Sequence, residues 1–197
     1  LIGGKHARLI TSQSDCSLVG LCDVDFTCRS LAEECSVPFY QDIEELLERQ
    51  RPEGVIIATP NGTHSTMAEI CARRSVDILI EKPIADTLHS ANSLVEVADE
   101  AGIQVLVGHH RRYNPFIQET RSIVQGGGLG KLVAVSMMWT LMKPPEYYDV
   151  SWRCRRPDGG PTLINLIHEL DLLRFICGEI NQVYAQSGSG VRRLDVE

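Results

Sequence analysis

The sequence lacks the features of a nucleic-acid-binding or membrane protein. It contains no basic run and no long apolar stretch, and its formal net charge is −7. An acidic surface repels polyphosphates and anionic lipids, and a membrane-spanning helix needs about 20 apolar residues. We therefore expect no nucleic acid and no membrane among its partners. At 197 residues and 43% hydrophobic composition, the chain can bury one full core and part of a second.

Cysteine motifs of the zinc and redox types are also missing. The seven cysteines form no Cys-x-x-Cys pair and no zinc-like grouping with histidine. Most lie inside apolar helix or strand patterns, where a free thiol behaves as a small hydrophobe. We therefore expect no metal site and a reducing, cytoplasmic compartment. The chain also starts without an initiator Met or the charged region of a signal peptide, which predicts that it begins inside a longer protein.

The most informative stretch is an apolar run from Val76 to Ile80 that is followed directly by Glu81, Lys82 and Pro83. Such a run is typical of a strand buried on both faces of a parallel sheet. Ligands bind outside the carboxyl ends of such strands, so the acid and the lysine would face a binding crevice. Pro83 fixes its own φ and allows a cis bond, either of which would aim the lysine. The alternative is a surface lysine after a strand.

Apolar strand patterns alternate with helical patterns over the first half of the chain. This order predicts an α/β fold with a Rossmann-type, doubly wound parallel sheet that lacks its first strand. The expected domain is residues 1–114. Its strands are predicted near residues 19–23, 37–40, 54–59, 76–80 and 104–108, and its helices near residues 1–11, 27–35, 42–50, 65–73 and 86–102.

Two turns of this domain carry candidate nucleotide contacts. Gly3 and Asp23 are about 20 residues apart, the interval between the last glycine of a dinucleotide fingerprint and the acid that binds the ribose. A chance spacing explains this pair equally well. Thr59, Asn61 and His64 follow a predicted strand and are placed to face a nucleotide. Alternatively, Asn61-Gly62 is only a turn and His64 is only the start of a helix.

The pattern changes from His109 onward. Residues 109–115 concentrate basic groups and one tyrosine at a strand end, where they either grip a hydroxylated or anionic ligand or form a solvated link. Residues 115–197 are expected to form part of a substrate and dimerisation domain, an α+β unit with an open, mainly antiparallel sheet. We predict a helix over 115–125, a strand over 132–141, an aromatic and basic loop over 142–161, a helix from Thr162 to Gly178 and a strand over 180–187.

The predicted helix from Thr162 has apolar residues around nearly its whole circumference, which indicates burial. Asn165, His168 and Asp171 recur every three residues and form one polar stripe on it. A lone buried histidine is usually structural. Three aligned polar residues instead favour a site, because each needs a buried partner or a ligand.

Several segments together resemble the Gfo/Idh/MocA family of oxidoreductases. They are Leu1-Ile2-Gly3, Ala58-Thr59-Pro60-Asn61, Glu81-Lys82-Pro83, Arg111-Arg112-Tyr113-Asn114-Pro115 and the stretch from Gly159-Gly160 to His168 and Asp171. The resemblance covers essentially the whole chain. It implies a nicotinamide-dependent enzyme that oxidises a hydroxyl of a sugar or cyclic polyol, or runs the reverse reduction.

The resemblance also implies roles for individual residues. Lys82 would lie beside the nicotinamide and the substrate hydroxyl, and His168 would be the general acid/base. Asp23 would favour NAD over NADP, because its charge repels a 2′-phosphate. The remaining cofactor contacts would be Ile2, Gly3, Thr59, Pro60, Asn61, His64 and Glu81, and the substrate contacts would be Arg112, Tyr113, Trp152, Asn165 and Asp171.

One position departs from the family pattern. Many members carry an Asp four residues before the histidine, where this chain has Ile164 followed by Asn165. An isoleucine neither orients nor polarises His168. The alternatives to a dehydrogenase are therefore a non-catalytic sensor of dinucleotide and an NAD-dependent glycoside hydrolase. The family's C-terminal sheet often packs between subunits, which implies a homodimer or homotetramer. Only two strands of that sheet are predicted here, so we expect the chain to be truncated at both ends.

Overall fold

The computed structural model describes residues 2–155, 159–186 and 196. They form two compact units, Leu1–Gly108 and His109–Glu197, which we call the N-terminal and C-terminal units. The division falls a few residues before the expected domain boundary at residue 114. Each unit is described by itself.

The N-terminal unit is built on short parallel strands. β1 pairs with β2, and β3, β4 and β5 form a second sheet in that order. The strands are β1 (Leu21–Cys22), β2 (Phe39–Tyr40), β3 (Gly54–Ile57), β4 (Asp77–Ile80) and β5 (Val105–Val107). A doubly wound sheet has the order 3-2-1-4-5-6. The described strands match its positions 3-2 and 4-5-6 and supply none at position 1, in agreement with the sequence-based prediction.

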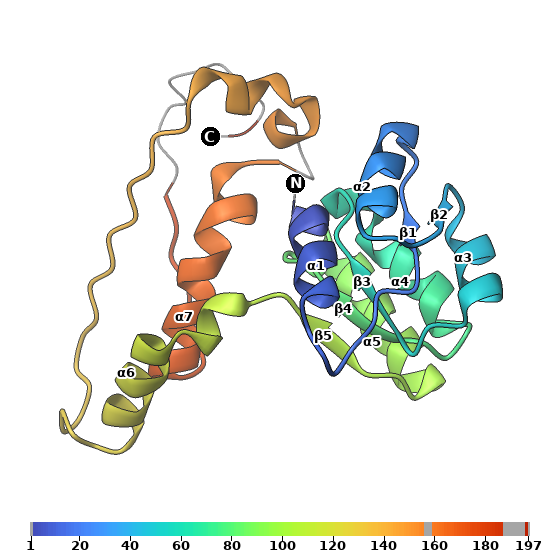
Figure 1. Ribbon diagram of the computed structural model, residues 1–197. Helices are drawn as coiled ribbons and strands as arrows, with labels where there is room; N and C mark the ends of the chain where they lie inside the picture. Colours follow the sequence, from blue (N-terminus) through green and yellow to red (C-terminus); the bar gives the residue numbers. More distant parts are fainter. Residues whose placement is uncertain (1, 156–158, 187–195, 197) are drawn as a thin grey trace. The chain divides into compact units, whose positions relative to one another are not determined.

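Helices connect these strands at the predicted places. They are α1 (Ile2–Thr11), α2 (Arg29–Glu34), α3 (Ile43–Gln50), α4 (His64–Ala72) and α5 (Leu88–Ala101). The side chain of Asp42 caps α3 by accepting from the Glu44 amide, and Thr87 caps α5 by accepting from the Ser90 amide. Gly102 ends α5 in the left-handed conformation with φ 66°, which suits glycine because it has no Cβ. Figure 1 shows these helices surrounding the strands.

Strand β4 supplies the centre of the core. Its register places Ile80 opposite Ile57 of β3 and Val107 of β5. Ile78 is 3% exposed and Ile80 is fully buried. The other buried core residues around them are Tyr40, Leu46, Leu47, Ile57, Ala68, Cys71, Val76 and Leu94. A strand that is paired on both sides and covered on both faces explains the apolar run in the sequence.

The regular secondary structure described in the C-terminal unit is helical. It contains α6 (Pro115–Gln125), the 3-10 turns Pro145–Asp149 and Ser151–Cys154, a π-helical turn (Thr162–Leu166) and α7 (Ile167–Cys177). Asn114 caps α6 by accepting from the Phe116 amide, and α6 packs against α7. Figure 1 shows these two helices side by side, and a long extended segment leading from α6 to the 3-10 turns.

Two strands expected from the sequence do not form. Residues 132–141 and 179–186 have no paired neighbour in the part of the chain that the structure describes, and Ser187 lies outside it. Alternating apolar residues form a strand only when another strand satisfies their backbone groups. Val133 is accordingly 90% exposed and Val183 is 75% exposed.

The expected complete burial of α7 was also wrong. Asp171 is its buried residue, and Leu170 is 40% exposed. The described neighbours of α7 therefore cover only part of its apolar surface. Of the helices described, none is long and apolar enough to cross a membrane.

The core position of β4 predicts a large effect of truncating Ile80. Ile80→Ala should lower the free energy of unfolding by roughly 2–5 kcal/mol, because it removes apolar contacts and leaves a cavity. Leu106→Ala, at a residue of the adjacent strand that is 60% exposed, should lower it by less than about 1 kcal/mol. Urea unfolding followed by circular dichroism measures both, and equal losses would contradict the assignment.

Candidate functional site

The charged end of β4 is held by a histidine from α1. Nε2 of His6 lies 2.8 Å from Oε1 of Glu81, and the two side chains are 22% and 12% exposed. The other carboxylate oxygen, Oε2, accepts from the backbone N–H of Lys82 at 3.3 Å. A Cβ on Gly108, just past β5, would lie 3.3 Å from this carboxyl group. Because Gly108 has no side chain, the Glu81 carboxyl group can lie directly beside its backbone.

The Lys82-Pro83 peptide is cis, as the sequence allowed. The carbonyl group of Pro83 contacts a buried histidine. Nδ1 of His64 lies 2.7 Å from the carbonyl oxygen of Pro83, and Nε2 lies 2.9 Å from that of Thr59. The ring is 1% exposed. A neutral imidazole donates from only one nitrogen, so both carbonyls receive a hydrogen bond only when the ring is protonated.

The His64 ring is enclosed, and its two nitrogens face main-chain oxygens. Its expected role as a cofactor contact stays a proposal. The ring connects the turn after β3 to the turn after β4. The alternative that His64 begins a helix agrees with the structure, since it is the first residue of α4.

The other candidate cofactor residues belong to the N-terminal unit. Asp23 follows β1 and is exposed, and its Oδ1 accepts from the Asp25 amide at 2.9 Å. Ile2 is 43% exposed at the start of α1. A Cβ on Gly3 would lie 3.5 Å from Ala58, so α1 packs closely on the segment after β3. Thr59 and Pro60 are exposed, whereas Asn61 is 6% exposed.

In the C-terminal unit, Asp171 of α7 binds Arg112. Nε of Arg112 donates to Oδ2 at 2.9 Å, and Nη2 donates to Oδ1. Asp171 is 6% exposed, and Nδ1 of His109 lies 3.6 Å from Oδ2. The hydrogen bond between Arg112 and Asp171 raises the pKa of the Arg112 guanidinium above its usual value. Beside this pair, Nη1 of Arg111 donates to Glu169 at 2.6 Å. Arg112 and Asp171 are thus bound to each other, and their expected role as substrate contacts stays a prediction.

The residues of the polar stripe, Asn165, His168 and Asp171, also contact other side chains. His168 is half-buried, and its ring meets that of His110 edge-on at 5.2 Å. Nδ2 of Asn165 donates to the hydroxyl of Tyr147 at 3.4 Å. Asn165 belongs to the π-helical turn that precedes His168, and π-turns often occur at functional sites. Each stripe residue therefore has a neighbour, as the sequence analysis required.

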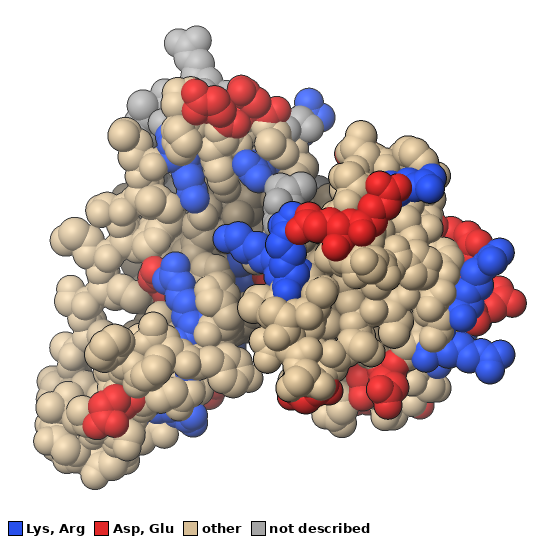
Figure 2. All heavy atoms as spheres, in the orientation of Figure 1, with Lys and Arg blue, Asp and Glu red and all other residues tan. Residues whose placement is uncertain are grey.

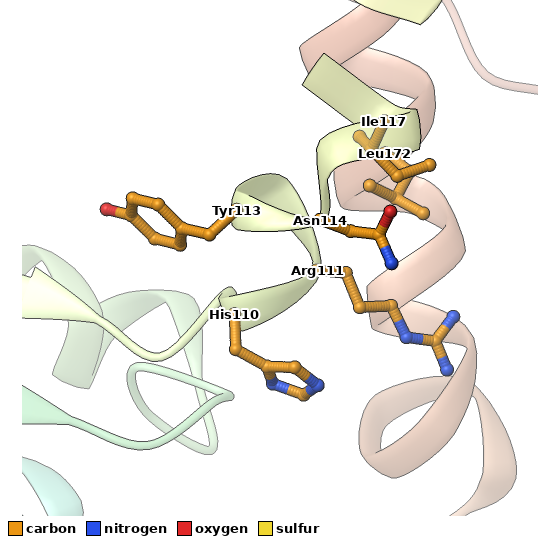
Figure 3. A pocket seen from close by; sticks show the side chains of 6 residues that line it. All are labelled: His110, Arg111, Tyr113, Asn114, Ile117 and Leu172. Atoms are coloured by element: carbon orange, nitrogen blue, oxygen red, sulfur yellow. The ribbon is translucent and has the colours of Figure 1, made fainter. Parts of the chain in front are cut away.

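A cavity of about 570 Å³ lies where the 3-10 turn His110–Tyr113 meets α6 and α7. Its lining residues are His110, Arg111, Tyr113, Asn114, Ile117 and Leu172. Figure 3 shows Ile117 and Leu172 together at one side, Arg111 and Asn114 beside them, and the Tyr113 ring directed away. Tyr113 is 79% exposed. Charged groups beside an apolar wall suit a small polar ligand.

Trp152, another expected substrate contact, is half-buried. It lies under the Arg153 guanidinium, which is 5.6 Å from its ring centroid. Among the described residues, no three His, Cys, Asp or Glu side chains gather closely enough to hold a metal ion. On the face shown in Figure 2, acidic and basic side chains are interspersed.

Two residues of these networks, His6 and Gly108, were not among the candidates from the sequence. His6 lies 75 positions from Glu81, and no local pattern connects a helix residue to an acid so far along the chain. Gly108 carried a weak signal, since a glycine that ends a buried strand often marks the close approach of another group.

Two family models match the chain. Residues 1–109 match that of an oxidoreductase family with an NAD-binding Rossmann fold, and residues 117–197 match that of the GFO/IDH/MocA C-terminal domain.

Individual relatives are similar over most of the chain. A 2,7-anhydro-N-acetylneuraminate hydratase of Mediterraneibacter gnavus is 26% identical over 96% of this chain and 50% of its own length. A myo-inositol 2-dehydrogenase of Thermotoga maritima is 27% identical over 93% and 54%. The WlbA dehydrogenase of Bordetella pertussis, solved with NADH and UDP-GlcNAcA, is 27% identical with a TM-score of 0.91, over 100% of this chain and 58% of its own. The chain thus spans about half the length of the curated relatives it matches.

Replacing His64 should destabilise the N-terminal unit. His64→Phe leaves the carbonyls of Thr59 and Pro83 without a donor in a buried place, which costs about 1–3 kcal/mol in the free energy of unfolding. His89→Phe, on the exposed face of α5, should change it by less than about 0.5 kcal/mol. Urea unfolding provides the comparison, and a stable His64→Phe protein would show that the two contacts contribute little.

The Arg112 and Asp171 side chains should act as one unit. Arg112→Met and Asp171→Asn should each lower the free energy of unfolding by about 1–3 kcal/mol, reduced by the partial exposure of Arg112. The double variant should lose less than the sum, because the interaction is already absent in each single variant. The exposed pair of Arg174 and Glu179 is the control and should contribute less than about 1 kcal/mol. Additive losses would contradict the coupling.

Proposed function

Because this chain belongs to the Gfo/Idh/MocA family of oxidoreductases, we propose that the protein is an NAD-dependent dehydrogenase that acts on CH–OH groups. Hydride would pass between the nicotinamide and a carbon of a sugar, a cyclic polyol or a related small molecule. The observation that carries this proposal is the turn after β4, where His6 binds Glu81 and His64 binds the Pro83 carbonyl. The turn holds Lys82 at the edge of the sheet where doubly wound folds bind dinucleotides.

The residues at this edge fit a dinucleotide. Asp23 is an exposed acid just past β1, so its carboxylate would accept hydrogen bonds from the ribose hydroxyls and repel a 2′-phosphate, which favours NAD over NADP. When bound, NAD supplies the hydride acceptor. The other proposed contacts are Ile2 and Gly3 at the start of α1, Thr59, Pro60, Asn61 and His64 after β3, and Glu81 and Lys82 after β4.

The proposed chemistry needs two groups besides the cofactor. Oxidation of a secondary alcohol removes the hydroxyl proton as hydride leaves the carbon. We assign removal of this proton to His168, because an imidazole exchanges protons near neutral pH. We assign stabilisation of the alkoxide to the Lys82 ammonium. Family members often have an Asp at the position of Ile164, and in the structure the His110 ring lies beside His168.

The proposed substrate contacts are Arg112, Tyr113, Trp152, Asn165 and Asp171. Tyr113 lines the 570 Å³ cavity, and Trp152 offers an aromatic face to a sugar ring. Arg112 and Asp171 would support this site through their ion pair, which joins the segment after β5 to α7. We further propose a cytoplasmic enzyme that assembles as a homodimer or homotetramer through its C-terminal domain.

A second candidate function is favoured by one of the relatives. The hydratase of Mediterraneibacter gnavus is named for a reaction without net oxidation. A protein of this kind would consume its substrate without accumulating NADH, as would an NAD-dependent glycoside hydrolase. A non-catalytic sensor would bind NADH and consume nothing.

Lys82→Ala separates these functions. With NAD and a panel of inositols, sugars and sugar acids, the full-length protein should form NADH, followed at 340 nm, and Lys82→Ala should lower kcat by about 10²–10⁴-fold. The control Lys5→Ala, at an exposed residue of α1, should retain full activity.

The remaining outcomes are also informative. Substrate loss without NADH accumulation would establish the hydratase or hydrolase reaction. NADH binding without loss of any substrate would support the sensor. A Lys82→Ala protein with unchanged kcat would overturn the role of this lysine.

A further inference from the structure

Two cations share one aromatic ring in the C-terminal unit. Nζ of Lys143 lies 4.7 Å from the centroid of the Tyr147 ring, and Cζ of Arg153 lies 4.6 Å from the same centroid. Arg153 also covers the Trp152 ring at 5.6 Å and donates from Nη1 to the carbonyl oxygen of Tyr147 at 3.3 Å. Lys143, Tyr147 and Arg153 are all half-buried. We call these three residues the cation cluster.

The cation cluster contains no carboxylate. Arg111, Arg112 and Arg174 of the same unit each bind an acid at 2.5–2.7 Å. No acidic side chain in the described chain lies within 4.0 Å of Lys143 or Arg153. An aromatic face compensates a cation only in part. Two like charges beside one ring therefore favour a nearby anion.

The cluster is connected to the proposed catalytic helix. The hydroxyl of Tyr147 accepts a hydrogen bond from Asn165 at 3.4 Å. Asn165 lies three residues before His168, in the π-helical turn that leads into α7. An anion at the cluster would thus be bound by side chains that share contacts with the segment carrying the proposed general base.

We propose that the cation cluster is a subsite for an anionic group of the substrate, either a sugar carboxylate or the phosphate of a nucleotide-linked sugar. The planar fork of Arg153 matches the oxygens of either group in a bidentate arrangement, and Lys143 adds a point charge. Trp152 would lie against the sugar or base that carries the anion. This assignment rests on the proposed function and makes it more specific, since it excludes neutral polyols as the best substrates.

Four ligands test the subsite, with affinity measured by calorimetry in the presence of NADH. D-glucose has neither acidic group, D-glucuronate has the carboxylate, UDP-glucose has the diphosphate, and UDP-glucuronate has both. At least one acidic ligand should bind tenfold or more tightly than D-glucose. Lys143→Met and Arg153→Met should each remove at least tenfold of that affinity and leave the binding of D-glucose and NADH unchanged. Lys131→Met, at an exposed residue of the same unit, is the matched control.

The pattern of losses identifies the anion. A loss confined to ligands with the carboxylate assigns the subsite to the sugar acid, and a loss confined to UDP-linked ligands assigns it to the diphosphate. Equal affinity for all four ligands, or equal loss in the Lys131→Met control, would overturn the proposal.

The binding measurement also separates this inference from the proposed function. NADH formation from neutral polyols without preference for acids would overturn the subsite alone. Cluster-dependent binding of an acid, with intact NADH binding and no turnover, would support the subsite and overturn the dehydrogenase.

Discussion

The contact between His6 and Glu81 is the constraint on which the N-terminal unit's candidate site depends. Strand β4 is buried up to Ile80, and the next residue is an acid that is only 12% exposed. A carboxylate in such a place requires hydrogen-bond donors. His6 supplies one from α1, and the Lys82 amide supplies another. The backbone direction at Lys82 is thereby coupled to the packing of a helix from the start of the chain.

His64 acts on the other side of the same turn. Its ring joins the carbonyl oxygens of Thr59 and Pro83, so the ends of two adjacent strands cannot move independently. Preorganised groups of this kind contribute to catalysis because they need no rearrangement when charge develops. The C-terminal unit has an analogous device in the pair of Arg112 and Asp171, which joins the segment after β5 to α7.

The helices and strands of the N-terminal unit were predictable because their signals are local. Asp42, Thr87 and Gly102 cap helices that lie within the predicted ranges, and the apolar run around Ile78 and Ile80 became the buried strand. The strand predicted over residues 132–141 did not form, because strand pairing is not a local property. Their alternation predicts a strand, but pairing depends on a second segment that a local pattern does not specify.

The candidate site was predictable in its residue types and less so in its contacts. Lys82, His168 and the polar stripe were found from sequence, as was the need of that stripe for partners. The partners themselves, such as Tyr147 for Asn165 and His110 for His168, come from segments whose approach is set by tertiary packing. The burial of the His64 ring was not predictable from the sequence, because it depends on how the turn after β4 packs against α4.

The π-helical turn at Thr162–Leu166 has an evolutionary consequence. Such a turn accommodates one more residue than an α-helical turn, so a single-residue deletion here would restore a regular helix. Each α-helical residue turns the chain by about 100°, and the deletion would therefore rotate everything before the turn relative to His168. Asn165 would leave Tyr147, although no residue of the stripe had been replaced. The length of the helix at this turn therefore decides which neighbours its polar side chains meet, independently of which residues they are.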